Sequence, residues 1–269
     1  EAAAKAKENA RLAAKAVTAK AKAEKEARVV AKAATKAEAE EEPRVAAEAA
    51  AKAAEGFDDL HHGRAGCKIQ ETEMRAIAVQ QLKDVRQYIR CHCEAKGWAA
   101  KKKVGEEWVH DFDFKAETLN LYGANDYIIM PATGARKCSY VELVAEGAQK
   151  PTWFCSHWWG ESVLDFVACV ETHAVDHGYG QGKELSEYQF DATAYWVCAY
   201  ANNQHDLASV NAPTLEETSF YKALKLAEGA VSILDPGGQC FKRVWCSYEM
   251  YISLTQMEGK LYEVYTAHE

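Results

Sequence analysis

Three short groups of polar and aromatic residues in the C-terminal half of the sequence could bind and act on a small molecule. They are Ser156, His157, Trp158 and Trp159; Asn202 and Asn203; and Trp245 with Glu249. A carboxylate can stabilise the positive charge that develops on a sugar carbon when a bond to that carbon breaks. Tryptophan rings can stack on a flat heterocycle, and asparagine amides can hydrogen-bond sugar hydroxyls. Glu249 offers a carboxylate for chemistry of this kind, and the other residues are candidates for ligand binding.

These groups can act together only if the fold brings them to one place. Apolar runs that predict strands lie at 152–158, 194–200, 230–234 and 261–265, and helical patterns follow at 163–174, 218–228 and 244–257. Alternating strands and helices of this length are typical of a parallel sheet with helices on both faces. Ligands of such sheets bind at the carboxyl ends of the strands. We therefore expect the three groups to meet at that edge.

The same residues carry a resemblance to a known family. The segments WFCSHWWG (153–160), the strand end at 202–204, the helix 220–227 and RVWCSYE (243–249) resemble a TIR-like (Toll/interleukin-1 receptor-like) domain. The divergent versions in dinoflagellate-type algal proteins are the most similar. The resemblance covers about 128–266 and implies a flavodoxin-like sheet. Its most specific motif is Trp-Cys-x-x-Glu, which in NAD-cleaving TIR domains contains the catalytic glutamate and so assigns that role to Glu249.

Two functions remain open from the sequence. The first, which we favour, is a protein-interaction or scaffold module that is docked in a larger assembly through its N-terminal segment. It is supported by the loop after the second strand, which does not match the pattern of the TIR nucleotide pocket. The alternative is a TIR-type NAD hydrolase that cleaves the nicotinamide–ribose bond, which the Trp-Cys-x-x-Glu motif and the polar strand ends favour. NAD would then be a substrate, and no resident cofactor is expected.

The N-terminal part of the chain differs sharply in composition. Residues 1–56 are mostly alanine, lysine, glutamate and arginine with no aromatic residue, which predicts a long helical arm broken near Pro43. Large apolar side chains are too sparse there for a coiled coil, so we expect either a solvated spacer or an arm that lies along a protein partner. Residues 57–127 predict an amphipathic helix (71–96) with connecting segments, and 128–269 predict the α/β domain. The segment 127–133 predicts a strand or extended chain.

Composition excludes several classes of function. The formal net charge of −8 argues against nucleic acid as a partner, and no apolar run is long enough to span a membrane. Nine scattered cysteines favour reduced thiols in an intracellular, reducing compartment: the cytoplasm, or an organelle if a targeting segment preceded the sequence.

Two groups of possible metal ligands do not predict a metal site from the sequence alone. Cys91, His92 and Cys93 would point to different faces of a helix. His173 and His177 have the spacing of metal ligands on a helix, but the sequence shows no third ligand beside them.

The pair Ser156 and His157 does not predict a serine hydrolase. It lacks the turn motif of that class, and adjacent residues on a strand point to opposite faces.

Overall fold

A computed structural model describes residues 57–61, 64–180, 192–207, 210, 212–257 and 259–267. The predicted helical arm at 1–56 lies outside the described residues. Among the described helices, none combines the length and the apolar character needed to cross a bilayer. All nine cysteines are free thiols.

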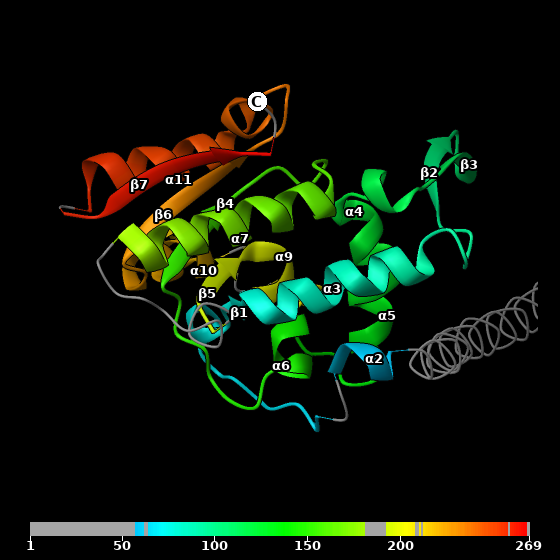
Figure 1. Cartoon of the computed structure of the whole chain (residues 1–269), viewed down its shortest axis with the longest axis horizontal. Coiled ribbons are helices and arrows are strands. Elements are labelled where there is room, and N and C mark those ends of the chain that lie inside the picture. The colour runs from blue at the N-terminus through cyan, green and yellow to red at the C-terminus, as the bar shows by residue number, and fades with distance from the viewer. Residues whose placement is uncertain are drawn as a thin grey trace, which may run out of the picture. The chain divides into compact units, whose positions relative to one another are not determined.

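A five-stranded sheet forms the centre of the described structure (Figure 1). Its strands, in spatial order, are β1 (Ile77–Ala78), β5 (Ala194–Val197), β4 (Trp153–Ser156), β6 (Gly229–Leu234) and β7 (Leu261–Thr266). The last four are parallel to one another, whereas β1 pairs with β5 in the antiparallel direction. The predicted α/β fold with a mostly parallel sheet is therefore confirmed. The four parallel strands have the spatial order second, first, third, fourth, which is consistent with a flavodoxin-like sheet.

Helices cover both faces of this sheet because its strands are apolar on both sides. Alternate residues such as Trp153, Tyr195 and Val231 pack on one face against α3 (Val79–His92) and α7 (Val163–Gly180). Their neighbours, Phe154 and Trp196 among them, pack on the other face against α10 and α11. These two helices comprise Ser219–Leu226 and Val244–Thr255. The strong apolar runs and helical stripes of the sequence thus form the elements they predicted, although α7 continues well past residue 174.

Residues 57–127 share their core with the α/β part of the chain. The buried cluster on the α7 face extends from Phe57 to Ile233 and includes the apolar stripe of α3. The predicted amphipathic helix is confirmed but begins later than expected, because residues 72–74 form a 3₁₀ turn and 77–78 form β1.

Two predictions about local structure are wrong. The segment 127–133 is helical: a π-helix (Asn125–Ile129) leads directly into α5 (Met130–Thr133), which contains Pro131. The second predicted strand is shorter than expected, because the chain turns into α9 (Cys198–Ala201) directly after Val197.

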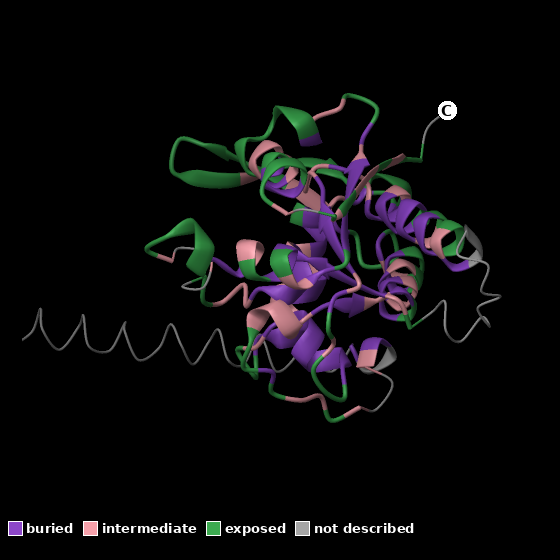
Figure 2. Cartoon of the chain, turned by 90° about the vertical axis from the view of Figure 1, so that its left-hand side faces the viewer, coloured by how far each residue is buried: buried purple, intermediate pink, exposed green. Residues whose placement is uncertain are grey.

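A β-hairpin that the sequence did not predict projects from the described core. It consists of β2 (Ala99–Val104) and β3 (Glu107–Asp113), joined by a turn in which Gly105 has a φ of 65°. Its residues are mostly exposed on both faces (Figure 2), so no alternation of apolar and polar residues marks it in the sequence.

Shorter helical elements complete the described structure. They are α2 (Asp58–His61), η1 (Thr72–Met74), η2 (Ala116–Thr118), α4 (Leu121–Ala124), α6 (Tyr140–Val144), η4 (Leu215–Glu217) and η5 (Cys240–Lys242).

Candidate functional site

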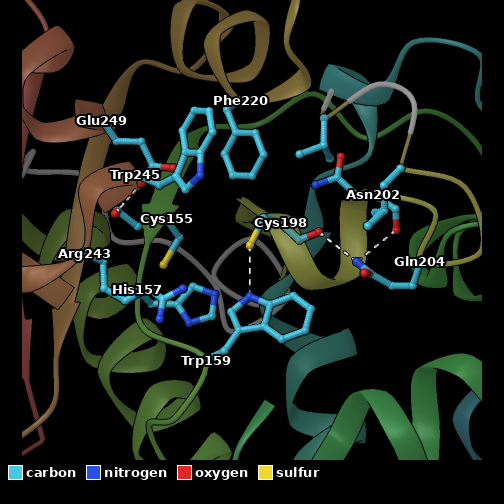
Figure 3. A pocket seen from close by; sticks show the side chains of 13 residues that line it. Cys155, His157, Trp159, Cys198, Asn202, Gln204, Phe220, Arg243, Trp245 and Glu249 are labelled. Atoms are coloured by element: carbon cyan, nitrogen blue, oxygen red, sulfur yellow. Dashed lines mark hydrogen bonds between the residues drawn. The ribbon is translucent and has the colours of Figure 1, made fainter. Parts of the chain in front are cut away.

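A cavity of about 250 Å³ lies at the carboxyl ends of β4 and β5, beside α10 and the start of α11 (Figure 3). Its lining consists of Cys155, Ser156, His157, Trp159, Cys198, Asn202, Gln204, Leu207, Val210, Phe220, Arg243, Trp245 and Glu249. The strand order explains this place. The chain passes from β4 to β5 on one side and then crosses to β6 on the other, and such a reversal leaves room for a ligand at the carboxyl edge.

Most of the residues predicted for the site meet in this cavity. Glu249, Ser156, His157, Trp159, Asn202 and Trp245 all contribute to its lining. They come from three separate parts of the chain: the end of β4, the turn after α9, and α11. The prediction that the polar strand ends converge is therefore confirmed for these residues.

Trp158 and Asn203 do not line the cavity. The ring of Trp158 lies over Gly160, where an added Cβ would come within 2.2 Å of it. Asn203 supports a loop instead: its Nδ2 donates to the Lys137 carbonyl at 2.8 Å, and its Oδ1 accepts from the His205 amide at 3.0 Å. Each is the sequence neighbour of a lining residue.

Glu249 is buried at the wall of the cavity, with 6% of its surface exposed. The Ser156 hydroxyl donates a hydrogen bond to its Oε2 at 2.5 Å. Burial raises the pKa of Glu249 well above its usual range, the nearby Cys246 raises it further, and the Ser156 hydrogen bond opposes both. Burial in the cavity wall therefore favours the neutral carboxylic acid form of Glu249 over the carboxylate.

His157 offers a second polar group to the cavity. It is almost fully buried against Phe166, and neither of its ring nitrogens has a well-formed hydrogen bond to a described residue. Burial lowers the pKa of His157 to about 4, against a smaller opposing effect of the Trp158 backbone, so the ring is neutral. A neutral imidazole can donate one hydrogen bond and accept another.

Aromatic rings bound the cavity on two sides. Phe220 and Trp245 stack on each other, with ring centroids 5.8 Å apart and an interplanar angle of 17°. Trp159 lies across from them (Figure 3), and its Nε1 donates to the Cys198 Sγ at 3.2 Å, which fixes the indole ring. These walls suit a flat ring between them.

Asn202 is also fixed in place. It is buried, and its side-chain oxygen accepts a hydrogen bond from the Ser219 hydroxyl at 2.8 Å. The Asn202 side chain also lines the cavity.

Several lining residues were not predicted as site residues. Phe220 packs against the buried cluster beside α10, and Cys198 is the first residue of α9. Leu207 and Val210 belong to an irregular loop. A stripe of apolar residues says nothing about which of its members borders a cavity, so no sequence signal identified them.

No protein-family model matches the chain, and no curated protein or solved structure is significantly similar to it.

Proposed function

We propose that the chain is a TIR-like domain that binds NAD in this cavity and cleaves the nicotinamide–ribose bond, with Glu249 as the catalytic residue. The observation that carries the proposal is the buried pair of Glu249 and Ser156 beside the stacked rings of Phe220 and Trp245. The resemblance of residues 243–249 to the Trp-Cys-x-x-Glu motif supports the assignment.

The proposed reaction requires Glu249 to carry a negative charge. The bond between the ribose C1′ and the nicotinamide ring nitrogen breaks, and its electron pair moves to that nitrogen, which neutralises the positive ring. The sugar carbon is left with oxocarbenium character until water adds to it and loses a proton. A carboxylate beside the ribose stabilises this charge, so the transition state requires the ionised form of Glu249.

The substrate itself favours that ionised form. The nicotinamide ring of NAD carries a positive charge, and an opposite charge nearby lowers the pKa of a buried carboxyl group. Glu249 therefore loses its proton when the substrate binds. In this proposal Trp159 or Trp245 stacks on a ring, while His157 and Asn202 hydrogen-bond the carboxamide or the ribose hydroxyls.

The test is release of nicotinamide from NAD by the purified full chain, followed by chromatography. We expect Glu249→Gln to reduce release at least ~100-fold, because the amide keeps the shape but cannot carry the charge. Glu217→Gln, which changes an exposed glutamate of η4, is the matched control and should leave turnover unchanged. Absence of nicotinamide release by the wild-type chain at saturating NAD would end the enzyme proposal.

A second candidate function is protein interaction. The proposed docking of residues 1–56 on a protein partner lies outside the described residues. In the described part, α11 exposes a stripe of apolar side chains at helical spacing: Val244, Tyr251 and Leu254. Beside it, β7 is an edge strand of the sheet. Sheet edges pair readily with one another, and two-fold dimers are the commonest assemblies, so a second copy of the chain is the partner that fits.

Sedimentation of the full chain over a range of concentrations tests this interaction. We expect reversible dimer formation, weakened by Leu254→Glu, which places a charge in the stripe. Lys242→Glu changes an exposed residue before α11 and serves as the control for charge alone. A chain that sediments as a monomer at every concentration would exclude the self-association.

A further inference from the structure

Two histidines and a glutamate form a compact group on the opposite face of the sheet from α11. His173 and His177 lie one turn apart on α7, and Glu263 lies on β7. Their ligand atoms all lie within 4.8 Å of one another. No local pattern in the sequence indicates Glu263 as a third ligand, because it lies 86 residues from His177.

We propose that His173, His177 and Glu263 bind a divalent transition-metal ion, with Zn²⁺ as the expected occupant. Zinc takes histidine nitrogen and carboxylate oxygen at about 2.0–2.2 Å in tetrahedral geometry, which separates neighbouring ligand atoms by roughly 3.4 Å. The distance from His173 Nε2 to Glu263 Oε2 is already 3.4 Å. The distance from His177 Nε2 to Glu263 Oε2 is 2.7 Å, so this pair must open by roughly 0.7 Å to take the ion.

The surroundings of His173 orient it as a metal ligand. Its Nδ1 lies 2.7 Å from the Tyr195 hydroxyl, and with the ring proton on Nδ1 this hydrogen bond leaves the lone pair on Nε2. That Nε2 is buried and has no hydrogen-bond partner among the described residues. Burial, aided by the neighbouring His177, lowers the pKa of His173 to about 3, so the ring is neutral and able to bind a metal.

Apolar packing fixes both imidazole rings. The Trp153 ring lies 4.4 Å from that of His173 and 4.3 Å from that of His177, measured between centroids. His177 and Glu263 are only partly buried, which gives an ion a path from solvent and leaves room for water as a fourth ligand. Two imidazoles with one carboxylate favour zinc and similar metals over Mg²⁺ or Ca²⁺, which prefer oxygen ligands throughout.

Metal titration of the full chain tests the site. Protein treated with a chelator and then dialysed is titrated with Zn²⁺ by calorimetry, with Mg²⁺ as the comparison. We expect one Zn²⁺ per chain, affinity at least ~10-fold lower in Glu263→Gln and in His177→Ala, and no saturable binding of Mg²⁺. The control is His110→Ala, which removes an exposed histidine paired with Asp113 on the hairpin and should leave the affinity unchanged.

A cobalt spectrum separates this site from binding by the free thiols, of which Cys91 is exposed. Bound Co²⁺ should show visible bands without a near-ultraviolet thiolate charge-transfer band, because all three protein ligands are nitrogen or oxygen. Zn²⁺ should also raise the melting temperature of the wild type but not that of Glu263→Gln, whose partly exposed side chain allows the variant to fold. A thiolate band, equal zinc affinity in Glu263→Gln, or no saturable zinc binding would each overturn the proposal and leave His177 and Glu263 as a simple ion pair.

Discussion

Glu161 is a buried carboxyl group near the carboxyl ends of β4 and β6. Burial raises its pKa to about 8, and the charges of Asp235 and Asp165 add to the shift. Its Oε2 has no hydrogen-bond partner among the described residues. Between pH 4.5 and about 8 the folded chain therefore holds a proton that the unfolded chain has lost. The contribution of Glu161 to the free energy of unfolding is therefore greatest below the pKa that this group has in the unfolded chain, and it declines as the pH rises through this window.

We predict that this effect shows in the free energy of unfolding. One such group lowers stability by at most about 1.4 kcal/mol per pH unit. Glu161→Gln keeps the shape without the titration, so its unfolding free energy should decline less with pH and exceed that of the wild type at pH 8. Urea unfolding at several pH values measures both quantities. The same slope in wild type and variant would show that Glu161 ionises normally in the folded chain.

A second prediction concerns the proton on Glu249. If the cationic nicotinamide ring lowers the pKa of this carboxyl group, NAD binding releases a proton, and the affinity rises with pH until the free site is itself ionised. Calorimetry in two buffers of different ionisation enthalpy measures the released proton directly. Glu249→Gln should bind NAD with no proton release. Pronounced release in that variant would assign the proton to another group.

At the scale of the elements, the packing of β5 depends on Trp196. This indole is fully buried, stacks on Phe154 with ring centroids 5.4 Å apart, and donates from Nε1 to the Thr72 carbonyl at 2.9 Å. We predict that Trp196→Ala costs ~3–5 kcal/mol of stability, because it leaves a cavity and an unpaired carbonyl group. Chemical unfolding followed by circular dichroism measures the loss.

The hairpin provides the matched control for that substitution. Trp108 on β3 is 67% exposed, so Trp108→Ala should change stability by no more than about 0.5 kcal/mol. Equal losses in the two variants would mean that the inward face of β5 is assigned incorrectly.

The sequence predicted helices and strands best where burial requires a regular pattern of apolar residues. The buried strands and the helices after them carry continuous apolar runs or helical stripes, which is why their positions agree with the structure. The hairpin carries no such pattern, because it is exposed on both faces. The segment 127–133 carries a short apolar run, and a run of this length fits a buried strand and a buried helix equally well.

The candidate site was predictable only in part, for a similar reason. Parallel strands end at one edge, so the residues after β4 and β5 could be placed together from the sequence. Contacts between distant segments follow no local rule. The position of Phe220 at the cavity and that of Glu263 beside His177 depend on how helices pack on the finished sheet.

At the scale of the whole molecule, the boundary between 127 and 128 can be tested by truncation. Val79, Leu82 and Ile89 of α3 are completely buried in the core that includes β4 and β6. We predict that a chain of residues 128–269 fails to fold cooperatively, because the α7 face of its sheet would be uncovered. A chain of residues 57–269 should melt near the temperature of the full chain. Thermal unfolding of the two shortened chains side by side provides the measurement, and a cooperative transition in the chain of residues 128–269 would establish an independent domain.

The hydrogen bond from Trp196 to the Thr72 carbonyl also bears on the order of folding. It joins residues 124 positions apart, and β1 pairs with β5 over a similar separation. A ribosome therefore releases α3 and its apolar stripe long before β5 exists to receive them. Contacts of such long range slow the search for the native state, and exposed apolar surface invites aggregation during that delay. A nascent chain that ends before residue 190 therefore exposes apolar surface that β5 later covers, and we expect a chaperone to bind at this stage of synthesis.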